Sequence, residues 1–394
     1  MRQGTFQWMK SVNRSIILNK IRTDAPISRA QIAKETKLTP PTVSSNVKEL
    51  IEQGIVRESE LGESRGGRKP TMLLINNKGF YVIGVDVGPK MIECIIADLA
   101  GNIVTRTSSK LTVPITNAQF LTILKEGIRT VIQDASINPE KFIGIGVAMH
   151  GVVEVETGIS LFAPNLGLTN IPIKEELEKE FELAVKVEND ARVMALGESW
   201  FGNHGKLDSM LAVNLGRGVG AGIVINGKLY HGAQDIAGEV GHMTIDVNGE
   251  ICECGNRGCL QTFATGSAIA KKAKKMLKEC SEQQVDQSSI TGKKVYELAL
   301  AGNEDCVKVL VETGIIIGIG LTNLIHIINP SKIVLAGGVT KSSKFILPAI
   351  CESIEQRALT PRAKQTEVII SELGDDATII GAIALLLVDL FDPL

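Results

Sequence analysis

The chain has 394 residues, of which 44% are hydrophobic and 22% charged, a balance typical of a globular protein with two or three domains. Its seven cysteines are an odd number and most are widely spaced, which favours a reducing cytoplasm over a disulfide-stapled scaffold. The start of the chain does not resemble a signal peptide. The most apolar run, residues 314–328, is too short to span a bilayer, so we expect a buried helix there and no membrane partner.

The net charge of −2 conceals an asymmetry along the chain. Residues 1–80 hold 14 Lys and Arg against 7 Asp and Glu, whereas the remainder holds 28 against 37. A basic N-terminal module on an acidic body indicates that only the first part approaches a polyanion. Chance variation of surface charge is the alternative, and charge alone does not decide between them.

Three helices are predicted within the first 54 residues. Residues 12–24 carry apolar side chains at helical spacing. Ser28 and Gln31 form a capping-box pattern that opens a second helix, which ends near Leu38. Thr39 caps a third, with Pro40 in its first turn, where a missing N–H is tolerated. This succession predicts a helix-turn-helix.

The third predicted helix has one apolar face, formed by Val43, Val47, Leu50 and Ile51. Its opposite face carries short or flexible polar side chains that suit a DNA major groove. The candidate DNA-binding residues of the second and third helices are Ser28, Arg29, Thr39, Thr42, Ser44, Ser45, Asn46 and Lys48.

Two extended segments, residues 55–61 and 71–76, are predicted to form a wing hairpin after Gly54. Between them lie Arg65, Gly66, Gly67 and Arg68. Glycines permit close approach of the backbone, and arginines suit the negative potential of a narrow A·T-rich minor groove. A solvated linker is the alternative, but the position after a helix-turn-helix favours minor-groove contact.

One cluster of metal-ligating residue types stands out, namely His242, Cys252, Cys254 and Cys259, in the spacing H-x9-C-x-C-x4-C. Four such ligands within eighteen residues meet the requirement of a closed tetrahedral zinc site. Gly255 and Gly258 allow the tight turns that aim several thiolates at one ion. The alternative is a set of buried free cysteines with a core histidine, and the density of the cluster argues against it.

The remaining chain shows two similar series of strands and turns. Residues 81–87, 91–97 and 103–110 form the first, with Asp86 and Gly88 at its first turn. The second begins at Ser209, with strands at 210–215 and 223–225 around the glycine-rich turn 216–222, and a later strand at 332–336. The repetition predicts the duplicated α/β fold of actin and the sugar kinases, which is ribonuclease H-like and has two lobes.

With these motifs the chain resembles the ROK family, which combines repressors and sugar kinases, and its repressor branch in particular. The resemblance covers nearly the whole chain. Besides the helix-turn-helix and the cysteine cluster, it rests on residues 86–88, 188–191, 215–220 and 238–242.

The resemblance implies a winged helix-turn-helix at residues 1–76. It implies a sugar-binding and dimerisation body at 80–394, with lobes at 80–190 plus the C-terminal helix and at 191–380. It also implies a structural Zn²⁺ held by His242, Cys252, Cys254 and Cys259. The implied sugar-binding residues are Gly151, Asn165, Asn189, Asp190, Glu239, His242 and Gln261.

The resemblance further implies that Asp190 stands where the kinases of the family have their general base. The phosphate loops depart from the kinase pattern, because Pro89 lacks an N–H and Arg217 stands where kinases tend to have Thr. Gln261 replaces the usual Glu after the cysteines. We therefore expect no enzyme activity, with Asp190 a vestigial base that accepts hydrogen bonds from sugar hydroxyls.

The expected function is that of a bacterial, cytoplasmic, sugar-responsive repressor of carbohydrate genes. It is expected to act as a homodimer or higher oligomer on a palindromic operator with A·T-rich flanks or centre. Xylose is the effector that overall likeness to the repressor branch favours. A sugar kinase with an accessory DNA-binding module, a regulator controlled by a protein partner, and an activator are the alternatives.

Overall fold

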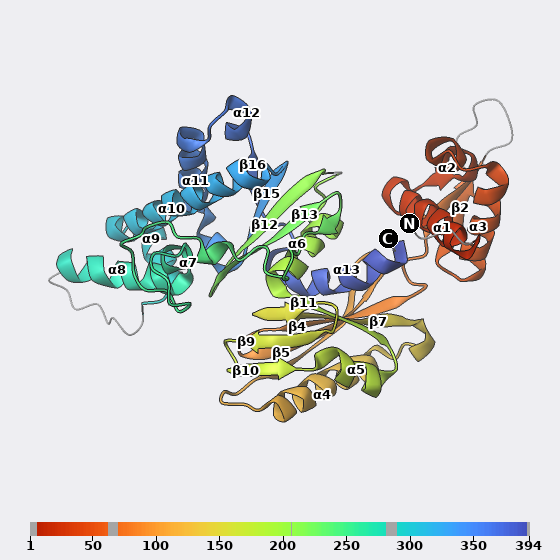
Figure 1. Cartoon of the computed structure of the whole chain (residues 1–394), viewed down its shortest axis with the longest axis horizontal. Coiled ribbons are helices and arrows are strands. Elements are labelled where there is room, and N and C mark those ends of the chain that lie inside the picture. Colours follow the sequence, from red (N-terminus) through yellow and green to blue (C-terminus); the bar gives the residue numbers. More distant parts are fainter. Residues whose placement is uncertain (1–5, 62–69, 206, 281–289, 392–394) are drawn as a thin grey trace. The chain divides into compact units, whose positions relative to one another are not determined.

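The computed structural model describes residues 6–61, 70–205, 207–280 and 290–391 (Figure 1). The chain separates into two compact units, residues 1–188 with 382–394 and residues 189–381. The predicted domains at 1–76 and 80–394 stay a prediction, because the first unit holds both the N-terminal module and the first part of the body.

The N-terminal module is a winged helix-turn-helix. Its elements are α1 (Phe6–Asp24), β1 (Ile27–Ser28), α2 (Arg29–Thr36), α3 (Pro40–Glu52), β2 (Val56–Leu61) and β3 (Thr71–Ile75). The three strands form one sheet in the order β1-β3-β2. Its core is aliphatic and fully buried, with Ile17, Leu18, Ile21, Ile27, Ile32, Val43, Val47, Leu50 and Leu73.

The two predicted helix caps are confirmed. The Ser28 side chain accepts a hydrogen bond from the Gln31 backbone N–H, and the Thr39 side chain accepts one from Thr42. Two helix boundaries and the burial of one residue differ from expectation. α1 begins six residues earlier, α2 ends at Thr36 because Lys37 adopts a left-handed conformation, and Ile51 is only half-buried.

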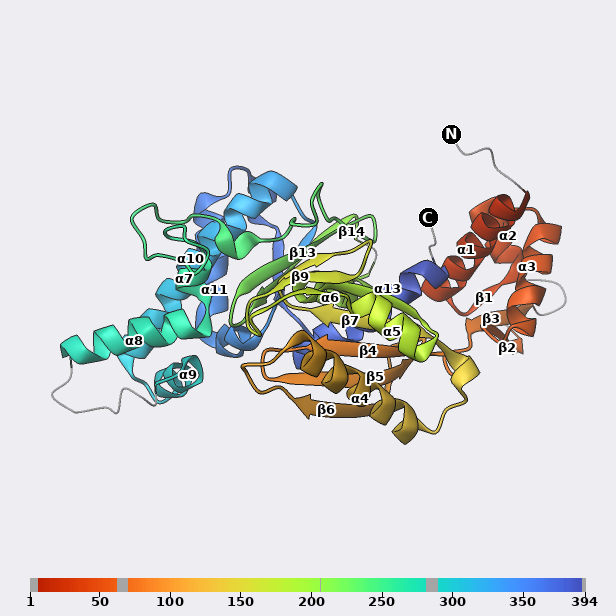
Figure 2. The same cartoon turned by 60° about the horizontal axis from the view of Figure 1, so that its bottom comes forward.

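The body of the first unit is built on a five-stranded sheet in the order β11-β7-β4-β5-β6. These strands are β4 (Tyr81–Val87), β5 (Met91–Asp98), β6 (Ile103–Lys110), β7 (Phe142–Met149) and β11 (Ala184–Asn189). Helix α4 (Asn117–Ala135) lies against β5 and β6 (Figure 2). A small sheet of β8 (Val152–Glu154), β9 (Ile159–Ala163) and β10 (Leu168–Ile171), with η1 (Pro139–Lys141) and α5 (Ile173–Phe181), completes it.

The second unit repeats this arrangement in the sheet order β14-β13-β12-β15-β16. Its strands are β12 (Ser209–Leu215), β13 (Val219–Ile225), β14 (Lys228–Leu229), β15 (Lys332–Ala336) and β16 (Glu367–Ile370). Its helices are α6 (Asp190–Phe201), η2 (Val240–His242), α7 (Gln261–Ala264), α8 (Gly266–Cys280), α9 (Gly292–Leu300), α10 (Glu304–Ile328), η4 (Gly338–Ser342), α11 (Ser343–Arg357), α12 (Pro361–Lys364) and η5 (Gly374–Asp376).

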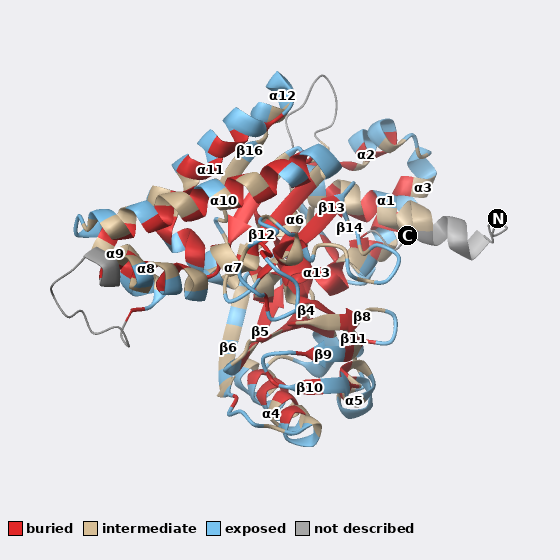
Figure 3. Cartoon of the chain, turned by 60° about the vertical axis from the view of Figure 1, so that its left-hand side comes forward, coloured by how far each residue is buried: buried red, intermediate tan, exposed pale blue. Residues whose placement is uncertain are grey.

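The two sheets have the same topology. Each sheet begins, in chain order, with an antiparallel meander of three strands. A later strand then pairs in parallel with the first strand of the meander: β7 pairs with β4, and β15 pairs with β12. Both leading strands are mostly buried (Figure 3). The predicted duplicated, two-lobed α/β fold is confirmed.

The last helix, α13 (Ala377–Phe391), begins in the second unit and ends in the first. It packs so closely on β7 that a Cβ on Gly146 would lie 1.9 Å from the carbonyl oxygen of Ala382. Helix α10 is long and apolar enough, by composition, to cross a membrane. However, half of its most apolar window is buried, and it packs against α11 in the core. We therefore interpret α10 as a core helix.

Candidate functional site

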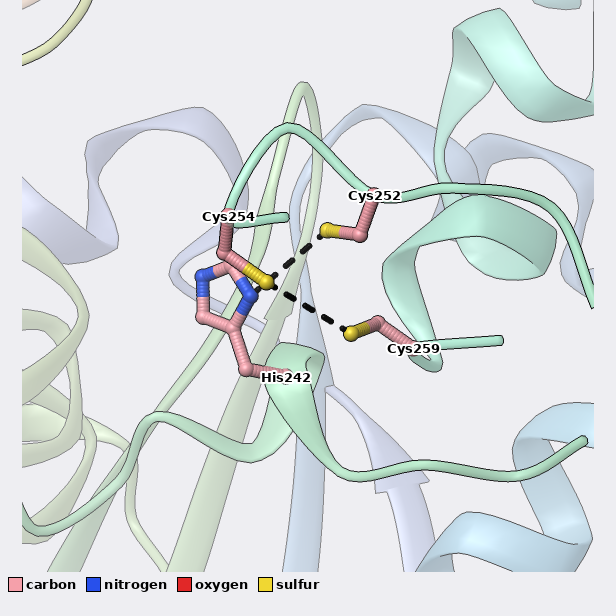
Figure 4. A group of neighbouring side chains, drawn as sticks. All are labelled: His242, Cys252, Cys254 and Cys259. Atoms are coloured by element: carbon pink, nitrogen blue, oxygen red, sulfur yellow. Dashed lines mark hydrogen bonds between the residues drawn. The ribbon is translucent and has the colours of Figure 1, made fainter. Parts of the chain in front are cut away.

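The four predicted metal ligands converge in the second unit (Figure 4). His242 ends η2, and the three cysteines lie on the loop between η2 and α7. Their ligand atoms all lie within 4.8 Å of one another. Cys252 and Cys259 are buried, His242 is half-buried and Cys254 is exposed.

The spacing of these atoms fits a tetrahedral ion. Zn–S bonds of about 2.3 Å at tetrahedral angles place two sulfurs about 3.8 Å apart. The Sγ atoms of Cys254 and Cys259 are 3.7 Å apart, and Sγ of Cys252 lies 3.7 Å from Nδ1 of His242. Three thiols and one imidazole at these separations could hold a metal ion with tetrahedral coordination.

The loop that presents the cysteines is held by backbone contacts. Isolated bridges join Thr244 to Cys259 and Ile251 to Arg257. Gly255 and Gly258 both have positive φ, +90° and +62°, as the tight turns require. At Gly258 a Cβ would lie 1.6 Å from the Asp246 carbonyl oxygen, so only glycine fits there without displacing the backbone.

The cluster thiols have contrasting acidities. A backbone hydrogen bond from Asn256 is the main cause that lowers the pKa of Cys254 to about 7, whereas burial raises the pKa of Cys259 to about 12. A thiolate is the form that ligates a metal. Cys254 is therefore about half ionised near neutral pH, whereas Cys259 must release its proton to solvent when a metal ion binds.

Gln261 contacts the metal cluster rather than standing apart from it. Its Nε2 donates a hydrogen bond to Sγ of Cys252 at 3.2 Å. Its Oε1 lies near the glycine-rich turn, 3.8 Å from where a Cβ on Gly218 would be. The predicted sugar-binding role of Gln261 stays a prediction, and the structure adds a contact to Cys252, a predicted metal ligand.

The other predicted sugar-binding residues of the second unit lie around the start of α6 and beside β13. Asn189 caps α6, because its Oδ1 accepts hydrogen bonds from the backbone N–H groups of Ala191 and Arg192. Asp190 is the first residue of the helix and is half-buried. Exposed Glu239 precedes η2, in a segment held to β13 by the hydrogen bond from Ala221 N to Gly238 O.

In the first unit the predicted sugar-binding residues are Gly151 and Asn165. Gly151 has a φ of +87° and turns the chain between β7 and β8, where a Cβ would lie 2.1 Å from the Phe162 carbonyl oxygen. Asn165 is exposed in the turn that follows β9. The turn at Gly151 packs closely on Phe162 and Pro164, and it therefore lies beside the turn that carries Asn165.

The two phosphate-loop-like turns use their own backbone groups. Gly88 donates its N–H to the carbonyl oxygen of Met91, and Pro89 has no N–H. In the second turn Gly216 donates its N–H to Gly218 O, and Arg217 is exposed. At Gly88 and Pro89 the first turn therefore offers no free N–H to a phosphate.

The candidate nucleic-acid interface is the exposed face of α3. Ser44, Ser45 and Lys48 are exposed there, as is Thr39 at the cap. Thr42 is half-buried, and its hydroxyl lies 2.8 Å from that of Thr39. These side chains present the polar groups that reach base edges or phosphates.

Three of the predicted DNA-binding side chains form contacts with other residues of the N-terminal module. Asn46 is buried and its Nδ2 donates a hydrogen bond to the carbonyl oxygen of Thr42, which corrects the expectation that its side chain is exposed for contact with DNA. Ser28 is buried as the cap of α2, and Arg29 forms an ion pair with Glu58 of the wing at 2.8 Å. The wing residues Arg65, Gly66, Gly67 and Arg68 lie outside the described residues.

Three polar features escaped the sequence pattern. Buried Arg192 donates a hydrogen bond from Nη1 to the carbonyl oxygen of Asp235, which ties α6 to the loop before Glu239. Glu198 and His204 form a buried pair in the second unit. His150, directly before Gly151, is buried in the first unit. Of these three features, only His150 could have been found from the sequence, because it lies directly before the predicted site residue Gly151.

Comparisons with known proteins agree with this arrangement. The ROK family model matches residues 82–388, and a winged helix-turn-helix DNA-binding model matches residues 14–57. The chain belongs to the ROK family. It is 33% identical to the xylose repressor of Caldicellulosiruptor bescii over 98% of both chains, and 32% identical to the DNA-binding transcriptional dual regulator NagC of Escherichia coli over 97% of this chain and 94% of that one.

A solved structure has the same fold along nearly the whole chain. It is a ROK family transcriptional regulator, described as a homologue of the Escherichia coli MLC protein. The two superpose with a TM-score of 0.86 at 28% identity, covering 97% of this chain and 98% of that one. The similarity therefore includes both the DNA-binding module and the body of this ROK protein.

Proposed function

We propose that this ROK protein is a sugar-responsive transcriptional repressor of carbohydrate genes. The observation that carries the proposal is the joining, in one chain, of a winged helix-turn-helix with an exposed polar α3 to a ROK body. Relatives that match over nearly their whole length are named as sugar repressors. Xylose and N-acetylglucosamine, the sugars in those names, are the first effectors to test. The other binding partner in this proposal is operator DNA, bound in the cytoplasm.

The proposal includes a structural Zn²⁺ and a homodimer. The tetrahedral fit of His242 and the three cysteines supports the zinc. When bound, the ion would brace the loop that joins η2 to α7. The helix-turn-helix supports the dimer, since such modules usually read two half-sites of a palindrome. Analytical ultracentrifugation of the purified chain, with and without operator DNA, tests the dimer.

Sugar acts by shifting a population in this proposal. Release from the operator requires that the sugar bind the DNA-released state more tightly than the DNA-bound state. The sugar-binding residues remain the predicted set, Gly151 and Asn165 in the first unit and Asn189, Asp190, Glu239, His242 and Gln261 in the second.

A sugar kinase with an accessory DNA-binding module is the second candidate, because Asp190 is retained. The engaged Gly88 N–H and the missing N–H of Pro89 argue against phosphate binding in the first turn. Steady phosphorylation of xylose or N-acetylglucosamine that is abolished by Asp190→Asn would favour the kinase. Control by a protein partner would be indicated if sugar binding were abolished while regulation of the operator persisted.

The deciding experiment is the sequencing of genomic fragments captured by the purified full-length chain, with and without xylose and N-acetylglucosamine. We expect palindromic sites beside sugar-uptake or catabolism genes, released by one of the sugars. Capture of no specific fragment would overturn the proposal. Capture that neither sugar releases would redirect it to another effector, and binding that increases transcription would make the protein an activator.

A matched pair of lysines tests the DNA interface. Lys48 on α3 and Lys293 on α9 are both highly exposed, and each lies 3.8–3.9 Å from a glutamate one helical turn later. Lys48→Ala is expected to weaken operator binding and, if the contact is to phosphate, to reduce the salt slope by about one. Lys293→Ala removes the same charge far along the sequence and should leave binding unchanged. Equal effects of the two variants on operator binding would show that Lys48 of α3 is not part of the DNA interface.

A further inference from the structure

His150 is a buried histidine whose ring has one hydrogen-bond partner. It follows the last residue of β7 and is 6% exposed. Its Nδ1 lies 3.1 Å from the carbonyl oxygen of Val87, at the end of the neighbouring strand β4. A carbonyl oxygen only accepts, so Nδ1 must carry the hydrogen in this contact. In the neutral ring, Nε2 is then left as an acceptor with a free lone pair.

That lone pair has no protein partner within the part of the chain that the structure describes. Nε2 of His150 is one of three buried side-chain polar atoms there without a hydrogen bond, the others being Oδ1 of Asn46 and Oγ of Ser160. An unsatisfied buried acceptor is unfavourable, because it has lost its hydrogen bonds to water without gaining others. A group from outside the chain that donates a hydrogen bond would relieve this cost.

The position of His150 in the fold is one where ligands bind. β4 and β7 are parallel, and Val87 and Met149 are paired at their carboxyl ends, directly before the histidine. In open α/β sheets, ligands bind outside the carboxyl ends of the strands. The next residue is Gly151, whose turn rests on Phe162 beside the turn of Asn165. His150 therefore shares its turn with one predicted sugar-binding residue and lies next to the turn of another.

We propose that Nε2 of His150 accepts a hydrogen bond from one hydroxyl group of the sugar effector. This inference rests on the proposed function and makes it more specific. An acceptor fixed by the Val87 contact requires a donor, so a hydroxyl fits, whereas a carbonyl or a deoxy position leaves the lone pair unpaired. Sites built to pair a substrate hydroxyl discriminate strongly against analogues that lack it.

Two substitutions separate this role from a structural one. His150→Asn keeps a donor near the position of Nδ1, and hence the bond to Val87, but has no atom at the position of Nε2. His150→Gln supplies an amide oxygen near that position. Titration calorimetry on the full-length protein would measure binding of xylose, N-acetylglucosamine and their singly deoxygenated analogues.

We expect His150→Asn to bind the operator like the original protein and the effector sugar at least tenfold more weakly, with partial rescue in His150→Gln. One deoxy analogue should lose at least tenfold in affinity for the original protein but bind His150→Asn as well as the parent sugar does. Sugar affinity of His150→Asn within twofold of the original value would overturn the inference and indicate a structural water, while the proposed function would stand. If neither sugar binds the original protein or releases it from DNA, this inference fails for both sugars and the proposed function is redirected to another effector, whereas the absence of specific DNA capture would overturn the proposed function itself.

A spectroscopic readout covers the case in which the variants do not fold. The chain has five histidines, so selective ¹⁵N labelling gives few imidazole signals. In the original protein Nδ1 of His150 should carry the hydrogen and Nε2 should show the shift of an unprotonated nitrogen, which moves when the effector sugar is added. A protonated Nε2, or an Nε2 shift that saturating sugar leaves unchanged, would also overturn the inference.

Discussion

Two glycines of the cysteine loop allow the zinc proposal to be tested through the backbone rather than through the ligands. Gly255 and Gly258 both have positive φ. A Cβ on Gly255 would meet nothing within 4 Å, whereas one on Gly258 would lie 1.6 Å from the Asp246 carbonyl oxygen. Alanine at Gly255 therefore adds only the cost of a left-handed residue, and alanine at Gly258 adds a clash as well.

The two costs differ by a measurable amount. A left-handed alanine costs about 1–2 kcal/mol, which is about a 5- to 30-fold loss of affinity for a metal that needs this loop conformation. At Gly258 the neighbours cannot yield freely, because Gly258 N donates to Glu250 O and Gly258 O accepts from Ile245 N, both at 2.8 Å. Losing those two hydrogen bonds adds about 1 kcal/mol each, for a total loss of about 100- to 1000-fold.

Competition with a fluorescent zinc chelator, performed on the full-length protein and both variants, measures these affinities. Circular dichroism controls for the overall fold. We expect Gly255→Ala to retain zinc at stoichiometric concentration and Gly258→Ala to lose it to the chelator. Equal affinities for the two variants would show that the Asp246 contact does not limit the loop. Absence of zinc from the original protein would refute the site itself.

The remaining predictions concern groups whose environment the structure fixes. Glu198 and His204 form a 2.8 Å pair whose side chains are 0% and 5% exposed, so Glu198→Ala, which leaves buried His204 without this partner, should lower the free energy of unfolding by about 1–3 kcal/mol, measured by urea denaturation. Burial raises the pKa of Cys94 to about 12, so at pH 8 iodoacetamide should modify it only after unfolding, as mass spectrometry would show. A hydrogen bond from Lys20 holds the pKa of exposed Glu35 below its usual value. This contribution is fully present above the unfolded pKa of about 4.5 and is lost as pH falls through the lower, folded pKa, so the urea midpoints of Lys20→Ala and the original chain should differ at pH 6 and converge only below pH 4.5.

Patterns that are local in sequence predicted their structures well. The caps at Ser28 and Thr39, the leading strands of both sheets and the cysteine loop each depend on neighbours within a few residues along the chain. Metal-ligand spacing is equally local, which is why the convergence of His242 with the cysteines could be anticipated. The two repeated series of strands and turns predicted the duplicated fold, whereas the order of the strands within each sheet depends on contacts between distant segments that no local pattern contains.

The predictions that failed depended on packing between distant elements. The glycine-rich run 216–222 was predicted as a turn, but β13 begins at Val219. Helix α6 crosses β13 so closely that side chains at Gly220 and Gly222 would clash with it. An added Cβ would lie 2.9 Å from the Cβ of Ala191 at Gly220, and 2.3 Å from the Cβ of Ala195 at Gly222. Likewise, the burial of Asn46 follows from how α3 rotates against the rest of its module.

Within the second unit, these contacts make the metal cluster and the predicted sugar-binding residues one connected structure. Gln261 contacts the metal ligand Cys252 through one end of its amide and lies near Gly218 with the other. β13, which follows that turn, holds Gly238 and thus the segment that leads through Glu239 to His242. Nδ1 of His242 faces the thiol of Cys252, which leaves Nε2 for a second partner. A zinc ion in this cluster would therefore also fix the imidazole ring of His242, which the resemblance assigns to sugar binding. By thermodynamic linkage, any increase in sugar affinity that zinc causes must be matched by an equal increase in zinc affinity caused by the sugar.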